Sequence, residues 1–314
     1  MKKLIAILLA AALVLSFAGC AKKNTGNKEQ TEAKLNIVCT IFPQYDFCRA
    51  ITKGVDGVEL KMLLAPGDES HSYSATLEDI AAINAADLFV YVGGESDEWV
   101  ENVLQTAAPK KSIALVELVE TLEESDEGIL TEEEEEEEGA RDEHVWTSPL
   151  NAVKITNALS DVICEIDSDN VQAYRANALD YTNRLSALDG QFKALFEKVN
   201  NKTIVIADRN PFRYFCEAYG ITAIAAFSGC SSNNEIPLSV QNKLIQAVKE
   251  NGLNYIYVIE LNTSSYADSI AKQTGATKLV LNSCHNLSKE NFESGKTYLD
   301  LMAENYETFK TAMQ

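Results

Sequence analysis

Three histidines are the residues of this chain whose type and placement could do chemistry. His71, His144 and His285 are its only histidines, and each lies in a stretch of turn-forming residues rather than inside a helix-periodic segment. A neutral imidazole offers a nitrogen lone pair, which makes histidine the commonest metal ligand in proteins. A single loop histidine is usually a surface or hydrogen-bonded residue, but three such placements favour a shared metal site.

Two of these histidines follow predicted strands. His71 comes after the strand-like residues 58–64, and His285 comes after residues 278–281. Because open α/β sheets bind ligands outside the carboxyl ends of their strands, we expect the histidines to converge in a cleft. Three neutral imidazoles and one carboxylate would suit tetrahedral zinc, whereas manganese prefers more oxygen ligands. A site of this composition would therefore favour zinc over manganese.

Strand-like and helix-like segments alternate along most of the chain, which is typical of an α/β fold with mainly parallel sheets. The alternation breaks at residues 171–199, where apolar side chains recur at three- and four-residue spacings without a proline. At about 1.5 Å per residue, such a helix would reach across both halves. We therefore predict an N-terminal α/β lobe over residues 34–170 and a C-terminal α/β lobe over residues 200–314. One long rigid helix would join them, with the metal site in the interlobe cleft.

The N-terminal residues carry the pattern of an export signal and a lipid anchor. Lys2 and Lys3 precede an apolar run that ends at Cys20, and this run is too short to span a bilayer as a helix. We predict a signal peptide over residues 1–19, acylation of Cys20, and a polar tether over residues 20–33. The folded chain would then be extracytoplasmic and anchored to the cell membrane through lipid.

Charge and cysteine content narrow the possible partners. The chain has 27 basic and 47 acidic residues, so its net charge is −20, or 25 − 47 = −22 once Lys2 and Lys3 are removed with the signal. Nucleic acid is therefore not an expected partner. Six cysteines follow Cys20 without a close-spaced pair, and we expect most of them to be buried. Cys230 and Cys284 could instead bridge to each other or bind metal.

A strongly acidic stretch, residues 123–143, contains seven consecutive glutamates from Glu132 to Glu138. Like charges at this density repel one another, so one interpretation is a solvated surface loop. The other interpretation is a low-affinity collector of cations, because His144 follows the stretch directly.

Several segments resemble the zinc/manganese solute-binding proteins of ABC importers. The most specific are Pro66–Tyr73 and His144–Pro149, and the resemblance extends to Ile41–Phe47, Ala86–Val90 and Gly94–Trp99. It implies two α/β lobes joined by a rigid helix, a metal buried between them, and delivery of that metal to an ABC importer membrane permease. We expect the protein to be a monomer.

The chain departs from this family in its second lobe. By the resemblance, one family ligand falls on Arg209 and another near Asn282, but arginine stays protonated and has no lone pair to offer. We infer that His285 replaces a missing ligand and that a carboxylate completes the shell, with Glu235 as first choice. Weaker choices are Asp208 and Glu260. The predicted metal ligands are thus His71, His144, His285 and Glu235.

A closed shell of four protein ligands leaves no open position for a reacting water. The predicted role is therefore capture and release of metal, and we do not expect an enzyme. One alternative is a zinc-dependent metalloenzyme in which Glu69 or Glu143 activates a bound water. Another is an adhesin-like surface lipoprotein whose fold the metal stabilises.

Overall fold

The computed structural model describes residues 35–69, 71–131, 140–231, 235–262 and 265–313. The predicted signal peptide, Cys20, the tether and the glutamates 132–138 lie outside these residues. The chain from Lys34 onwards forms one unit. Among the residues described, every helix is too short or too polar to span a lipid bilayer.

The first lobe is built on a parallel sheet with strand order β2-β1-β3-β4. Successive residues of its strands face two different apolar cores, one on each side of the sheet. Ile37 and Leu88 belong to one core, and Val38 and Phe89 belong to the other. Burial on both faces is what a parallel sheet covered by helices requires. The strands are β1 (Leu35–Cys39), β2 (Val58–Met62), β3 (Leu88–Tyr91) and β4 (Ser112–Ala114), and the helices are α2 (Phe42–Ile51), α3 (Leu77–Ala85), α4 (Glu98–Leu104) and α5 (Pro149–Ile166).

The second lobe repeats this plan with a parallel sheet of order β6-β5-β7-β8. Ile206 faces the core that the first sheet also uses, and its neighbour Val205 faces a separate core under α8 and α9. The strands are β5 (Thr203–Arg209), β6 (Thr222–Phe227), β7 (Tyr255–Ile259) and β8 (Thr277–Leu281), and the helices are α7 (Arg213–Tyr219), α8 (Leu238–Glu250), α9 (Tyr266–Thr274), α10 (Lys289–Glu293) and α11 (Tyr298–Ala312). Short 3₁₀ turns are η1 (Glu95–Asp97), η2 (Leu115–Leu118), η3 (Val145–Thr147) and η4 (Ser168–Asn170). The prediction of two parallel α/β lobes is confirmed.

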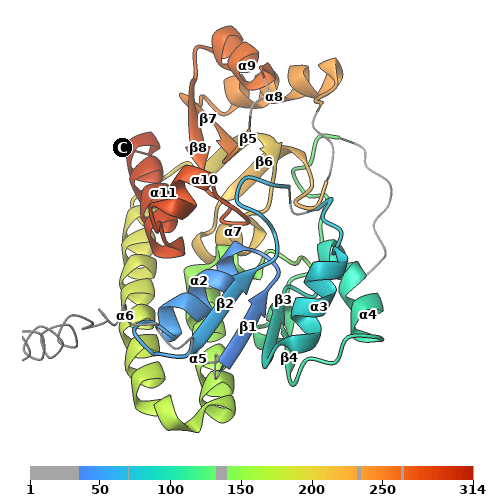
Figure 1. Cartoon of the computed structure of the whole chain (residues 1–314). Helices are drawn as coiled ribbons and strands as arrows, with labels where there is room; N and C mark the ends of the chain where they lie inside the picture. The colour runs from blue at the N-terminus through green and yellow to red at the C-terminus, as the bar shows by residue number, and fades with distance from the viewer. Residues whose placement is uncertain (1–34, 70, 132–139, 232–234, 263–264, 314) are drawn as a thin grey trace, which may run out of the picture. The chain divides into compact units, whose positions relative to one another are not determined.

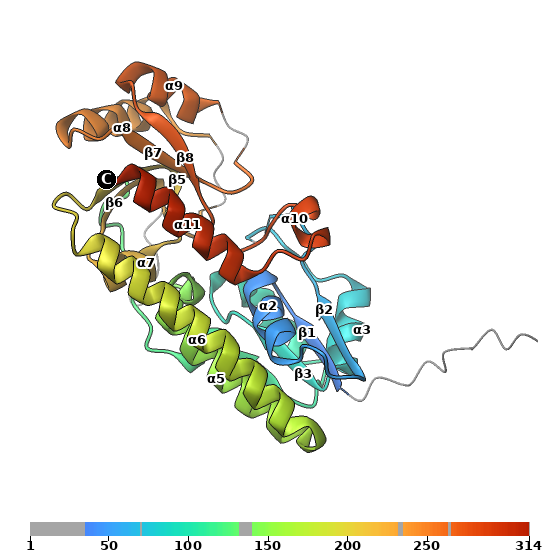
Figure 2. The same ribbon diagram turned by 90° about the vertical axis from the view of Figure 1, so that its left-hand side faces the viewer.

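Helix α6 (Val171–Phe196) joins the lobes and confirms the predicted long helix. Its 26 residues span about 39 Å, and it packs on α2 and α5 of the first lobe and on α7 and α11 of the second (Figures 1 and 2). Its buried stripe has the predicted helical spacing: Tyr174, Ala178, Tyr181, Leu185, Leu188 and Phe192. Because both sheets pack one face into this same core, the helix forms a stiff frame rather than a hinge.

Helix α11 ties the lobes together a second time. It packs on β8, on α6 and on α2 of the first lobe, and Figure 2 shows it running from the second sheet towards α2. The backbone N–H of Tyr298, at its first turn, donates to Asp46 of α2 at 2.8 Å, and the Tyr181 hydroxyl of α6 donates to the same carboxylate at 2.9 Å. The C-terminal helix therefore belongs to the interlobe frame as much as to the second lobe.

The acidic stretch is attached to the second sheet, although the sequence-based division places it in the first lobe. Ile129 forms a parallel bridge with Ala225 of β6, and the N–H groups of Leu130 and Thr131 donate to the carbonyls of Ala225 and Ala226 at 3.0 and 3.1 Å. Gly128 makes this approach possible, because its φ is +83° and an added Cβ would overlap the carbonyl oxygen of Ala223. Residues 128–131 thus cover the β6 edge of the sheet.

Replacing Gly128 with alanine should loosen this attachment. The left-handed φ and the overlap with Ala223 should together lower the free energy of unfolding by more than about 1 kcal/mol. Gly275→Ala is the matched control, because Gly275 has a φ of +79° but open space around a Cβ. Amide hydrogen exchange of residues 129–131 should accelerate only in Gly128→Ala, and equal exchange in both variants would contradict this account.

Candidate metal centre

The structure brings the three histidines together from three separate loops. His71 lies between β2 and α3, His144 is the N-cap residue of η3, and His285 lies between β8 and α10. The ring centroids are 5.0 Å apart for His71 and His285, 4.8 Å for His144 and His285, and 5.8 Å for His71 and His144. This convergence is what a shared site requires.

Glu143 completes a group whose potential metal-binding atoms all lie within 4.8 Å of one another, together with His71, His144 and His285. One carboxylate oxygen of Glu143 is 3.7 Å from Nδ1 of His71. The backbone N–H of Ser96 donates to the Glu143 carboxylate at 3.0 Å, and the Ser96 hydroxyl donates to it as well. Sequence reasoning named Glu143 only as a water-activating base, and its position directly before His144 was the available sign that it could act as a ligand.

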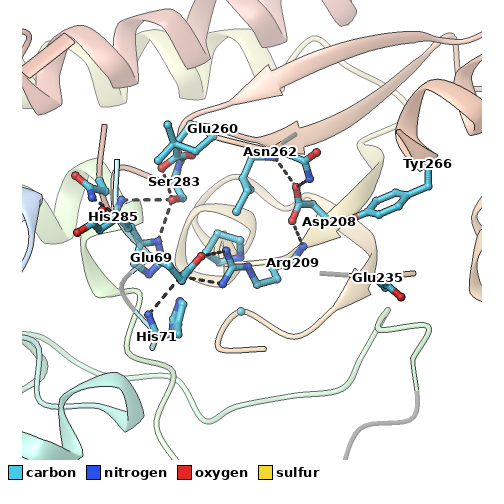
Figure 3. Close-up of a pocket in the computed structure, with 16 residues that line it drawn as sticks. Glu69, His71, Asp208, Arg209, Glu235, Glu260, Asn262, Tyr266, Ser283 and His285 are labelled. Carbon is cyan, nitrogen blue, oxygen red and sulfur yellow. Dashed lines mark hydrogen bonds and ion pairs between the residues drawn. The ribbon is translucent and has the colours of Figure 1, made fainter. Parts of the chain in front are cut away.

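Glu235, the predicted fourth ligand, lies in the same cavity but apart from this group. The cavity measures about 470 Å³ and is lined by His71 and His285 as well as by Glu235. In Figure 3, Glu235 lies on the other side of Arg209 from the two histidines. Its role as a ligand therefore stays a prediction beside the alternative that Glu143 offers.

The two weaker carboxylate choices have other partners. Asp208 accepts hydrogen bonds from the backbone N–H groups of Arg209 and Ile259 at 2.8 and 3.3 Å, and from the side chain of Asn262. Glu260 accepts two from Ser283. Cys230 and Cys284, the possible disulfide pair, are free thiols in the structure.

Two imidazole nitrogens of the site have no hydrogen-bond partner among the described residues. Nε2 of His144 and Nε2 of His285 are buried and form no hydrogen bond with any residue that the structure describes. Their Nδ1 atoms are engaged: Nδ1 of His144 lies 3.0 Å from Asp142, and Nδ1 of His285 lies 2.9 Å from the Ser283 hydroxyl. With the ring proton on Nδ1, both Nε2 lone pairs are available to a cation, as in protein metal sites whose outer partners fix the tautomer.

The Ser283 hydroxyl also contacts the half-buried carboxylate of Glu260. It donates to Glu260 at 2.6 Å, and the backbone N–H of Ser283 donates to the other oxygen of Glu260, also at 2.6 Å. Trp146 donates from Nε1 to the Ser283 carbonyl at 2.9 Å, and its ring lies 4.8 Å from that of His285. The second-lobe loop that carries His285 is therefore positioned by residues of both lobes.

Glycines form parts of the wall around the site. A Cβ at Gly229 would lie 2.7 Å from Cε1 of His144, and a Cβ at Gly94 would overlap the side chain of Glu143. Both side chains are fully buried. The close backbone packing fixes His144 and Glu143 in place and leaves little freedom for other rotamers.

Burial and neighbouring charges set the protonation of the histidines. Burial, with the charges of His144 and Arg209, lowers the pKa of His71 to about 3. Burial, with the charges of His144, His71 and Arg209, also holds the pKa of His285 well below its ordinary value. Burial alone would lower the pKa of His144 too, but the nearby carboxylates, chiefly Asp142 and then Glu143, together outweigh burial and raise that pKa. His71 and His285 are therefore neutral near pH 7, the form that can bind a metal.

Two α/β lobes around a buried group of three imidazoles and a carboxylate define a two-lobed metal-binding protein. The model of the family described as ZnuA, zinc-uptake complex component A, periplasmic, matches residues 37–312. The chain belongs to this family.

Individual relatives agree with this assignment. The zinc-binding lipoprotein AdcA of Streptococcus pneumoniae is 30% identical, over 99% of this chain and 61% of its own length. The high-affinity zinc uptake system protein ZnuA of Bacillus subtilis is 31% identical, over 99% of this chain and 98% of its own length. The chain thus spans less than two thirds of the pneumococcal protein. The Zn(II)-bound ZnuA-like domain of pneumococcal AdcA superposes with a TM-score of 0.74 at 28% identity, covering 89% of this chain and 98% of that domain. The crystal structure of the metal-dependent lipoprotein YcdH of B. subtilis superposes with a TM-score of 0.75 at 28% identity, covering 89% of this chain and 99% of that one.

Stability should depend on pH through Glu260. Burial raises the pKa of Glu260 from its ordinary 4.5 to about 7, so the folded protein holds this proton more tightly than the unfolded chain does. The contribution is fully present below pH 4.5 and is lost as the pH rises towards 7. In metal-free protein, the unfolding free energy of Glu260→Gln relative to the parent should therefore increase between pH 5 and 7, by roughly 1 kcal/mol per pH unit, and level off by pH 8. A difference that stays constant across this range would contradict the assignment.

Proposed function

We propose that this chain captures one zinc ion outside the cytoplasm and hands it to an ABC importer permease. The observation that carries the proposal is the pair of buried Nε2 atoms, on His144 and His285, that lack partners among the described residues and lie beside His71 and Glu143. Leaving buried polar atoms unpaired costs free energy, and a bound cation would repay that cost. Zinc as the bound ligand agrees with the zinc-binding relatives.

We assign the metal ligands as His71, His144 and His285 with Glu143 as the fourth. Three nitrogen ligands and one carboxylate oxygen at roughly 2.0–2.2 Å match tetrahedral zinc, while Mn²⁺ favours a larger number of oxygen ligands. The Asp142 and Ser283 contacts hold two of the rings in the tautomer that zinc binding needs. Glu235 remains the competing choice for the carboxylate, and it lines the same cavity.

Such a site suits transport rather than catalysis. Four protein ligands close the coordination shell, so no position is left for a water that a base could activate. Glu143, the candidate base, is already engaged by Ser96. We infer that the protein is not an enzyme.

The location and partner follow from the N-terminal sequence and the family. Residues 1–19 have the pattern of a signal peptide, and Cys20 stands where acylation would anchor the mature chain to the membrane. The family description names a periplasmic component of a zinc-uptake complex. We propose a monomeric, lipid-anchored receptor that works with an importer permease in the membrane.

Substitution of the ligands should separate Glu143 from Glu235. His71→Ala, His144→Ala, His285→Ala and Glu143→Gln should each weaken zinc binding by more than about 100-fold, because each removes a bond to the metal. Glu235→Gln, the control in the same cavity, should stay within about threefold of the parent. The measurement is competition titration against a chromophoric chelator, with elemental analysis of the bound metal. Loss of binding in Glu235→Gln with retention in Glu143→Gln would reverse the assignment.

Uptake can be tested in cells that lack their own zinc importers. The chain produced with the permease from its own genome should restore growth and zinc accumulation under zinc limitation, and the chain with His144→Ala should not. Cys20→Ser should release the protein from the membrane fraction. Equal zinc accumulation with the parent and with His144→Ala would contradict the role in uptake, whatever the protein binds in vitro.

A further inference from the structure

Arg209 lies at the carboxyl end of β5, beside the metal centre, where the family resemblance would place a ligand. Its Nη1 and Nη2 atoms donate to the two carboxylate oxygens of Glu69 at 3.2 and 2.8 Å, and Nη1 also donates to the Ser231 carbonyl at 3.1 Å. The guanidinium side chain is only 11% exposed. Figure 3 shows Arg209 pointing from the second lobe towards Glu69. The geometry is the bidentate pairing that a planar guanidinium favours.

Glu69 connects Arg209 to His71, one of the proposed metal ligands. It belongs to the first-lobe segment between β2 and α3, and the backbone N–H of His71 donates to its Oε1 at 3.3 Å. The same segment is held from the second lobe by Asn286, whose side-chain NH₂ donates to the carbonyls of Ala65 and Asp68 at 2.8 and 2.9 Å. The segment before His71 is therefore held by two second-lobe side chains, Arg209 through Glu69 and Asn286 through two backbone carbonyls.

Among the proposed ligands, His71 depends most on such contacts. His144 and Glu143 lie against glycine walls, and His285 is held by Ser283 and Trp146. Among the described residues, the His71 ring has one ion-pair contact, with Glu143 at 3.7 Å. Moving the segment before His71 would thus remove one ligand and leave the other three in place.

We propose that the Arg209–Glu69 pair is an interlobe latch, in which Arg209 acts as a positioning residue that keeps His71 on the bound zinc and so slows its release. The inference rests on the proposed function. The charge of Arg209 by itself would repel a cation, but the bidentate contact with Glu69 neutralises it, so the mechanical effect dominates while the pair is intact.

Three variants separate the latch from a purely electrostatic effect. Arg209→Met should raise the zinc dissociation rate about tenfold, because a charge-assisted pair is lost, while the association rate changes little. Glu69→Gln should raise it further, since it removes the latch and also leaves Arg209 unpaired beside the metal. The double variant Glu69→Gln with Arg209→Met should match Arg209→Met alone. A purely electrostatic role predicts the opposite for Arg209→Met, which would then hold zinc more tightly than the parent.

The experiment is stopped-flow transfer of zinc from the loaded protein to an excess of chromophoric chelator. Arg175→Met is the matched control, because Arg175 forms an exposed ion pair with Asp161 at 3.3 Å in the α5–α6 frame. Arg209→Lys should release zinc faster than the parent and more slowly than Arg209→Met, since lysine keeps the charge but not the bidentate geometry.

A second readout uses metal-free protein. Amide exchange of His71 and Ser72 should accelerate in Arg209→Met and in Glu69→Gln, with no change in Arg175→Met. Unchanged release and exchange in Arg209→Met would overturn the latch. If the parent itself bound no zinc, the proposed function would fail, and that outcome is distinct from failure of the latch.

Discussion

The structure depends on burying nitrogen lone pairs and a carboxylate together without pairing them to one another. Nε2 of His144 and Nε2 of His285 have no hydrogen-bond partner among the described residues, and Glu143 is fully buried beside them. Each unpaired buried group costs on the order of 1–3 kcal/mol. The remaining fold must therefore be stable enough to keep these groups in place before a cation arrives. In return, little of the binding free energy is spent on ordering the site.

The interlobe frame supplies that stability. One apolar core runs from the first sheet across α6 to the second sheet, and α11 packs on both lobes. A closely packed core resists continuous deformation, so large hinge movements are not the natural way to open this site. Local movement of a loop is less costly. The segment before His71 fits this role because side-chain contacts across the cleft hold it, whereas α6 is held by core packing.

Much of this fold could be predicted because its signals are local. The short apolar runs of β1 and β3, the helical stripe of α6 and the placement of His71 and His285 after strands are all visible in the sequence. Helices α5 and α11 lie outside the predicted elements, although both bury a helical stripe. What α11 does cannot be seen locally, since its partners α2 and α6 are more than a hundred residues away along the chain.

The fourth ligand shows where sequence reasoning reaches its limit. Glu235 and Glu143 are both loop carboxylates, and sequence offers no measure of which one faces the histidines. The deciding contacts are distant ones: Ser96 positions Glu143 from 47 residues away, and residues 128–131 attach the acidic stretch to β6. The positive charge of Arg209 is balanced by Glu69, which lines the same cavity, so Arg209 does not need Glu143 as its partner. An arginine at a position where the family resemblance expects a ligand is thus compatible with a complete site, provided that the fourth ligand comes from the residue before His144.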